Sequence, residues 1–136
     1  MSNLTADRED QRQDGILLSV PMSAVKLYKG SLVAFNTGGY AAKAADTSGF
    51  FLAGVAHEQV DNSGGSNGSQ NIRVIRKGVF EFNFSGTATQ ATVGAQVYMV
   101  DDNTVAVAAT TTNDVLVGRV VQFVSATKVR VELSAA

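Results

Sequence analysis

Cysteine and tryptophan are absent from the 136-residue sequence, which contains only one proline and one histidine. The lack of cysteine excludes disulfides, thiolate zinc sites and cysteine nucleophiles. Neither sign of charge dominates, since 11 Lys and Arg residues face 12 Asp and Glu residues and give a net charge of −1. This balance does not supply the positive field that binding to a phosphate backbone requires. We therefore expect no nucleic acid partner.

Long hydrophobic runs are missing as well. No apolar stretch approaches the roughly 20 residues of a membrane-spanning helix, so we expect no membrane partner. The apolar share of 45% and the charged share of 17% are instead typical of a chain that folds around a core. A length of 136 residues corresponds to about one domain.

Residues 1–14 differ from the rest of the chain in composition. Charged residues dominate this segment, whereas Met1, Leu4 and Ala6 are its only apolar members. Such a composition cannot offset the entropy lost on ordering, and it predicts a flexible polar arm. The apolar run Ile16–Val20, closed by Pro21, marks the start of the folded part. We therefore expect an arm over residues 1–14 and a single β-rich domain over residues 15–136.

Short apolar runs separated by Gly, Asn, Asp, Ser and Thr follow, a pattern typical of many short β-strands. Lys128–Leu133 alternates strictly and predicts a half-buried strand, and Phe80–Phe84 alternates with its phenylalanines on one face. We expect that face to be core or a contact between subunits. The Ala-rich segments 41–46 and 105–109 allow at most a turn of helix. The predicted strands are residues 25–28, 31–35, 40–44, 50–57, 71–76, 78–84, 95–100, 104–109, 115–124 and 127–133.

The sequence also repeats weakly within itself. A shift of 64 residues, without gaps, brings together residues of the predicted strands and turns, among them Gly30 with Gly94, Leu52 with Leu116 and Gly54 with Gly118. Two related β-units would pack together, because neither alone would bury its apolar face. The expected fold class is therefore all-β: a compact β-barrel or β-sandwich of short strands with a pseudo-duplicated unit and an extended N-terminal arm.

Candidate catalytic and metal-binding residues are few. His57 is followed by Glu58, but no serine lies in a nucleophile elbow, and we interpret the histidine as structural. Asp101–Asn103 is expected to form a turn, since a calcium loop needs about six to eight oxygen ligands. Asp61–Gln70 is expected to be an exposed flexible loop, because its glycines lack the Lys-Ser/Thr and the helix of a phosphate-binding loop. We therefore expect no enzyme activity, no catalytic residue, no cofactor and no metal.

Arg73, Arg76 and Lys77 form the only basic cluster. On a strand, Arg73 and Lys77 would share one face and Arg76 would point to the other. We favour a solvated strand whose charges discourage pairing at a sheet edge. Salt bridges to an acidic partner protein are the alternative.

Several short motifs follow one another in a recognisable order. They are Val25–Phe35, Gly39–Asp46, Leu52–Ala56, Lys77–Phe80, Gly94–Tyr98 and Val117–Val120. This ordered set, over roughly residues 20–133, resembles the capsid decoration (head cement) proteins of tailed phages. The resemblance implies a β-rich protein that binds the outside of an assembled head and braces neighbouring subunits of the major capsid protein, often as a trimer.

We therefore expect a non-enzymatic virion protein on the outer capsid surface, with the major capsid protein as partner and a homotrimer favoured. A low-copy tail or fibre-associated β-protein is the alternative. A ligand-binding β-barrel, for instance for carbohydrate, would require exposed aromatic residues, and only three tyrosines are present. The arm is expected to become ordered on the capsid by adding to a sheet edge. Its expected contact residues are Leu4, Ile16, Leu17, Leu18, Val20 and Pro21.

Overall fold

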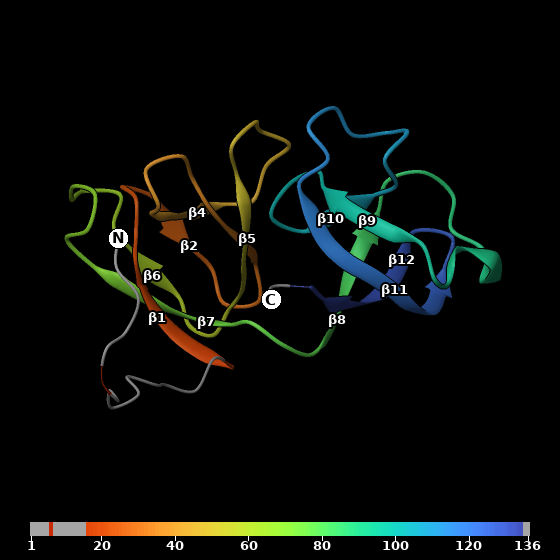
Figure 1. Ribbon diagram of the computed structural model, residues 1–136, viewed down its shortest axis with the longest axis horizontal. Helices are drawn as coiled ribbons and strands as arrows, with labels where there is room; N and C mark the ends of the chain where they lie inside the picture. The colour runs from red at the N-terminus through yellow and green to blue at the C-terminus, as the bar shows by residue number, and fades with distance from the viewer. Residues whose placement is uncertain (1–5, 7–15, 135–136) are drawn as a thin grey trace.

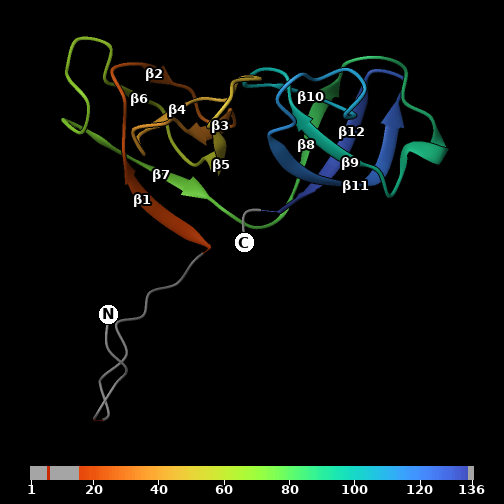
Figure 2. The same cartoon turned by 45° about the horizontal axis from the view of Figure 1, so that its top comes forward.

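A computed structural model of the chain describes Ala6 and residues 16–134, and every structural statement below concerns these residues. The expected all-β class is confirmed. The strands form two groups that lie side by side, joined by the segment between β7 and β8 (Figures 1 and 2). We call residues 16–75 the first unit and residues 79–134 the second unit.

The first unit contains a five-stranded antiparallel sheet in the order β1-β7-β5-β3-β4. An isolated parallel bridge between Met22 and Ala41 joins the two ends of this sheet. The short strands β2 and β6 pair separately. The strands are β1 Leu17–Pro21, β2 Lys26–Leu27, β3 Leu32–Phe35, β4 Ala41–Lys43, β5 Phe51–Ala56, β6 Val60–Asp61 and β7 Asn71–Ile75.

The second unit is a closed five-stranded barrel in the order β10-β8-β12-β11-β9. Its elements are β8 Val79–Phe84, the 3-10 helix η1 Gln90–Thr92, β9 Gln96–Met99, β10 Thr104–Ala106, β11 Leu116–Ser125 and β12 Lys128–Leu133. η1 is the only helix in the described part of the chain, and it is too short to span a membrane.

The two units share one topology, so the expected duplication is confirmed. Reading β8, β12, β11, β9 and β10 in place of β1, β7, β5, β3 and β4 reproduces the strand order of the first sheet. The registers agree as well: the pair Leu32–Val55 corresponds to Gln96–Arg119, each residue 64 positions later. The bridge Met22–Ala41 corresponds to the parallel pair Phe84–Val105 that closes the second barrel.

Two equivalent glycines let neighbouring strands approach closely in both units. A Cβ atom at Gly54 would lie 2.3 Å from the carbonyl oxygen of Ile75, and one at Gly118 would lie 2.0 Å from that of Glu132. Both distances are far below van der Waals contact. Any other residue would therefore push β5 away from β7, or β11 away from β12.

Each unit has a core, and the second core extends into the first unit. Val20, Met22 and Ile72 are buried in the first core, and their counterparts Phe82, Phe84 and Val129 are buried in the second. Residues from the outer face of β3 and β5, together with Ala44 directly after β4, also belong to the second core: Leu32, Ala34, Ala44, Leu52 and Val55. The two units therefore bury apolar surface against each other.

Hydrogen bonds reinforce this junction. The Asp46 carboxylate accepts the backbone N–H groups of Thr112 and Asn113, both at 2.8 Å, and these bonds lower the pKa of Asp46. The Asn113 side-chain amide donates back to the Asp46 carbonyl at 2.9 Å. The N–H of Leu32 donates to the carbonyl of Asp102 at 2.8 Å. Asp46 thus ties a turn of the first unit to a turn of the second.

Most of the predicted strands are present. Lys128–Leu133 alternates between exposed and buried residues as expected, and Phe82 and Phe84 are core residues. The Ala-rich segments contain strands β4 and β10 rather than helix. Strands β1 and β6 were not among the predicted strands, and η1 was not predicted either. The predicted arm over residues 1–14 lies outside the described residues except for Ala6.

Candidate interaction groove

His57 lies on the surface without an oriented carboxylate. The neighbouring Glu58 carboxylate instead accepts from the Arg73 side chain at 2.9 and 3.1 Å and from the Arg73 backbone N–H at 3.1 Å. These bonds lower the pKa of Glu58 to about 2. His57 itself borders a cavity of about 200 Å³ next to Phe80 and Glu81 of the second unit.

The acidic turn after β9 has a structural part in the fold. The Asp101 carboxylate accepts the N–H of Asn103 at 2.8 Å, which confirms the expected Asx turn. The Asp102 carbonyl accepts the N–H of Leu32 across the junction. Within the described residues, no three His, Cys, Asp or Glu side chains are close enough together to bind a metal ion.

The glycine-rich loop is organised around one buried side chain. Residues 63–70 are exposed as expected, whereas Asn62 is only 1% exposed. Its side-chain amide donates to the carbonyls of Ser23 and Ser66, each at 3.0 Å, and its oxygen accepts from Ser69 Oγ at 2.6 Å. Asn62 therefore pins the loop to the segment after β1.

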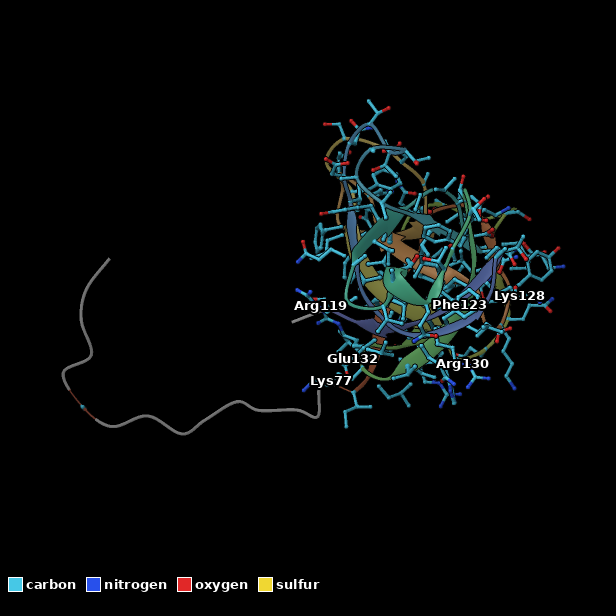
Figure 3. All side chains as sticks on the ribbon, turned by 90° about the vertical axis from the view of Figure 1, so that its right-hand side faces the viewer. Lys77, Arg119, Phe123, Lys128, Arg130 and Glu132 are labelled. Carbon is cyan, nitrogen blue, oxygen red and sulfur yellow. The ribbon has the colours of Figure 1, made fainter. Side chains whose placement is uncertain are left out.

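The interpretation of the basic cluster as protection of a sheet edge is wrong, because β7 lies between β1 and β5. Arg73 forms the ion pair with Glu58. Its counterpart on β12, Arg130, lies 3.7 Å from Glu81, which Lys128 approaches to 3.9 Å. Figure 3 shows Lys128 and Arg130 on the outside of the barrel. The two units thus carry similar surface ion pairs.

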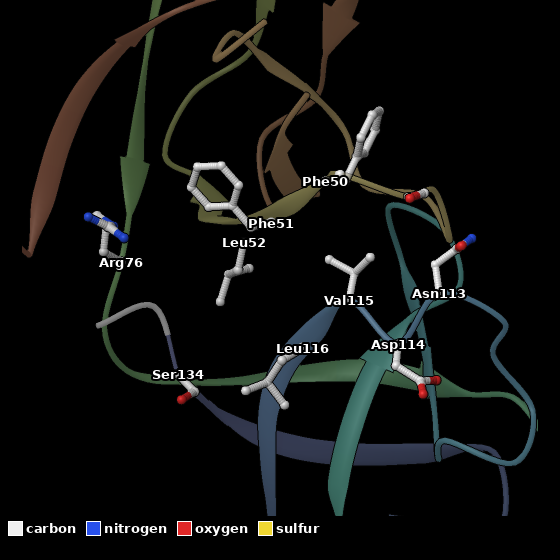
Figure 4. Close-up of a pocket in the computed structure, with 11 residues that line it drawn as sticks. Phe50, Phe51, Leu52, Arg76, Asn113, Asp114, Val115, Leu116 and Ser134 are labelled. Atoms are coloured by element: carbon white, nitrogen blue, oxygen red, sulfur yellow. The ribbon is translucent and has the colours of Figure 1, made fainter. Parts of the chain in front are cut away.

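A groove lies at the junction of the two units. It has a volume of about 490 Å³ and opens to solvent. Figure 4 shows Phe51, Leu52, Val115 and Leu116 in its middle. The complete lining is Ser48, Gly49, Phe50, Phe51, Leu52, Arg76, Asn113, Asp114, Val115, Leu116 and Ser134. We call this cavity the junction groove.

Phe51 is the most exposed large apolar residue of the described chain, with 56% of its surface accessible. Its ring packs against Phe35 with the centroids 5.1 Å apart and the planes tilted by 43°. This contact restrains the exposed Phe51 ring. Restrained, exposed aromatic side chains of this kind are typical of protein–protein interfaces. The sequence contains a signal for this exposure in the pair Phe50–Phe51, because consecutive residues of a strand point to opposite faces.

Opposite charges flank the apolar middle of the junction groove. Arg76 lies on one side, and Asp114 and Asn113 lie on the other (Figure 4). Asp114 adopts a left-handed backbone conformation with φ of 48°, and its carboxylate accepts from Thr111 Oγ1 at 2.6 Å. The apolar middle of the groove therefore lies between a cationic and an anionic side chain.

The predicted contact residues of the arm differ in their exposure, because most of them lie on strand β1. Ile16 and Leu17 are 50% and 40% exposed, and Pro21 is exposed. Leu18 packs against the first core, and Val20 is buried in it and is not available to a partner. The N–H of Arg76 donates to the carbonyl of Ile16 at 2.7 Å, so the exposed start of β1 lies beside the junction groove. Leu4 lies outside the described residues.

In comparisons with known proteins, no family model, no curated protein and no solved structure matches this chain.

Proposed function

We propose that this chain is a capsid decoration protein of a tailed phage. It attaches to the outside of the assembled head and braces neighbouring subunits of the major capsid protein, with a homotrimer as the favoured state. Many modest contacts, repeated over a closed shell, stabilise the shell collectively.

The observation that carries the proposal is the exposure of apolar residues next to Arg76 and the junction groove. Ile16, Leu17 and Phe51 are each at least 40% exposed. The N–H of Arg76 donates to the carbonyl of Ile16, and Arg76 and Phe51 line the same groove. Exposed apolar side chains next to an arginine are typical of a surface that binds another protein.

The decoration-protein resemblance supports the same conclusion. Its motif glycines occupy equivalent places in the two units: Gly30 and Gly94 have positive φ, and Gly54 and Gly118 lie at the close strand contacts. The motif order therefore follows the duplicated strand framework from one unit to the next.

Quantitative mass spectrometry of purified virions tests the proposal. A ratio of order one between this chain and the major capsid protein is the expected result. A few copies per particle would instead identify a tail or fibre-associated protein. Absence of the chain from virions would overturn the virion assignment.

Deletion of residues 1–14 tests the arm. The melting temperature of the free protein should stay nearly unchanged, because the charged arm has little apolar surface to bury. Attachment to heads that lack the protein should weaken. A large loss of thermal stability would show that these residues belong to the fold.

A further inference from the structure

The loop between β6 and β7 contains the only Asn-Gly pair of the sequence, Asn67–Gly68. Asparagine loses its side-chain amide most readily before glycine, because glycine has no side chain to hinder the attack of its own backbone nitrogen. Asn67 is exposed, and the structure gives its side chain no hydrogen bond with any described residue. The loop lies at the end of the first unit that points away from the second (Figures 1 and 2). Solvent therefore reaches this amide.

The reaction of such a pair needs only the chain itself and water. The backbone nitrogen of Gly68 loses its proton and bonds to Cγ of Asn67, while the bond between Cγ and the side-chain nitrogen breaks. The side-chain nitrogen takes up a proton and leaves as ammonia, and a five-membered cyclic imide remains. Water then opens the imide at one of its two carbonyl carbons and gives either aspartate or isoaspartate. No oxidant, metal or enzyme takes part.

The folded loop restrains the nitrogen that has to react. The N–H of Gly68 donates to the carbonyl of Met22 at 2.8 Å, and Met22 is fully buried. An amide nitrogen is a poor nucleophile until it loses its proton, because resonance with the carbonyl occupies its lone pair. Attack on Asn67 therefore requires Gly68 to give up its hydrogen bond to Met22.

The buried Asn62 side chain fixes the residues on both sides of the pair. Its amide donates to the carbonyl of Ser66 at 3.0 Å, and its oxygen accepts from Ser69 Oγ at 2.6 Å. Ser66 precedes Asn67 and Ser69 follows Gly68, so neither residue of the pair can turn freely while these bonds hold. The rate of reaction then depends on how often the loop opens.

We propose that Asn67–Gly68 is a site of spontaneous deamidation whose rate is controlled by the contacts of Asn62. Each conversion adds one negative charge and takes the net charge of the chain from −1 to −2. Isoaspartate also lengthens the main chain by a methylene group next to Gly68, which shifts the N–H of Gly68 away from the carbonyl of Met22. The site belongs to the chain alone and is independent of the proposed function.

Incubation of the purified full chain in mildly alkaline buffer tests this site. Peptide mass spectrometry measures the fraction of Asn67 converted with time. Conversion should be about tenfold slower in the folded protein than in the chain unfolded in urea, because the closed loop does not react. Asn62→Ala should react several times faster than wild type while still folded. Asn113→Ala is the matched control: it removes a side-chain hydrogen bond to the Asp46 carbonyl, far from this loop, and should leave the rate within about twofold.

Hydrogen exchange of the Gly68 amide gives a second readout that does not depend on the chemistry. This amide should exchange slowly in wild type and faster in Asn62→Ala, and melting temperatures verify that both proteins are folded. Asn67→Gln should abolish the conversion at this position, since ring closure from glutamine is much slower. Equal conversion in the folded and the unfolded chain, or none in either, would overturn the site. Faster exchange of Gly68 in Asn62→Ala without faster conversion would show that Asn62 does not control it.

Discussion

The outer face of β3 and β5 and the outer face of β9 and β11 occupy the same place in the two units but differ in polarity. In the first unit this face presents Leu32 and Val55, which are buried against the second unit. In the second unit the same positions hold Gln96 and Arg119, which are exposed. The shared topology therefore does not fix the polarity of a face. The polarity of a face depends on whether another unit covers it.

The comparison extends to the ends of the strands. In the second unit the turn after β11 spans only Ala126 and Thr127, and β11 and β12 form one long ladder. In the first unit the glycine-rich loop separates β6 from β7, and β6 pairs with β2 instead. The same strand arrangement thus tolerates two different connections. In the first unit, the Asn62 side chain holds the longer loop in place through hydrogen bonds.

The largest effects are expected where the units are identical. Gly54→Ala and Gly118→Ala should each destabilise the protein by about 4 kcal/mol or more, because the new methyl group would collide with a backbone carbonyl. Gly30→Ala and Gly94→Ala are matched controls with open space around the new atom, and positive φ alone should cost about 1 to 2 kcal/mol. Urea denaturation measures all four. Tolerance of either Gly54→Ala or Gly118→Ala would contradict the equivalence of the two close contacts.

Equivalent core side chains of the two units should contribute different amounts to the free energy of unfolding. Phe82→Ala should cost about 3 to 5 kcal/mol, since the ring is 3% exposed inside the second barrel. Its counterpart Val20→Ala should cost about 2 kcal/mol, because fewer buried carbon atoms are removed. Chemical denaturation gives both values. A near-neutral Phe82→Ala would place the phenylalanine face outside the core.

A leucine pair tests the covered and open faces directly. Leu52→Ala should cost about 2 to 4 kcal/mol, because Leu52 is 5% exposed and packs in the second core. The counterpart Leu116→Ala should cost less than about 1.5 kcal/mol, since Leu116 is only partly buried and borders the open junction groove. Equal losses in thermal denaturation would refute the role of the junction in setting this difference.

A smaller effect than that of the buried core substitutions is expected at the Asp46 contact, which has no counterpart in the second unit. Asp46→Ala should cost about 1 to 2 kcal/mol at pH 6, because two backbone N–H groups lose a charged acceptor. The folded pKa lies below the ordinary value of 3.8, so this contribution is present above about pH 4 and is lost as the pH falls through the folded pKa.

Denaturation at pH 6 and near pH 2 measures this change. The stability difference between wild type and Asp46→Ala should shrink at the lower pH. Thr110 occupies the equivalent position, and Thr110→Ala should change stability by less than about 0.5 kcal/mol at both pH values. A pH-independent difference would show that the Asp46 carboxylate is not the source of the stabilisation.

The strand framework could be predicted because local patterns encode it. Alternation at Lys128–Leu133 and Phe80–Phe84 indicates which face is buried, and the 64-residue shift pairs Gly54 with Gly118 before any contact is known. The short β6 escaped prediction because its partner β2 is distant in sequence. The apolar run at β1 indicated the start of the fold but not that its alternate residues lie in the core.

The candidate groove was harder to predict. Phe51 and Arg76 were visible as an aromatic pair and a basic cluster, but Asp114 and Leu116 come from the other unit. No local pattern brings these residues together, since their proximity depends on how the units pack.

The sequence alone determined the β-class, the duplication and the buried face of most strands, because side-chain alternation and glycine placement act over a few residues. The tertiary structure alone decided that Leu32 is buried while Gln96 is not, that β7 is an inner strand, and that Phe51 and Arg76 share a groove. These properties depend on the packing of one unit against the other, which joins residues far apart in the chain and is set by the summed burial of apolar surface.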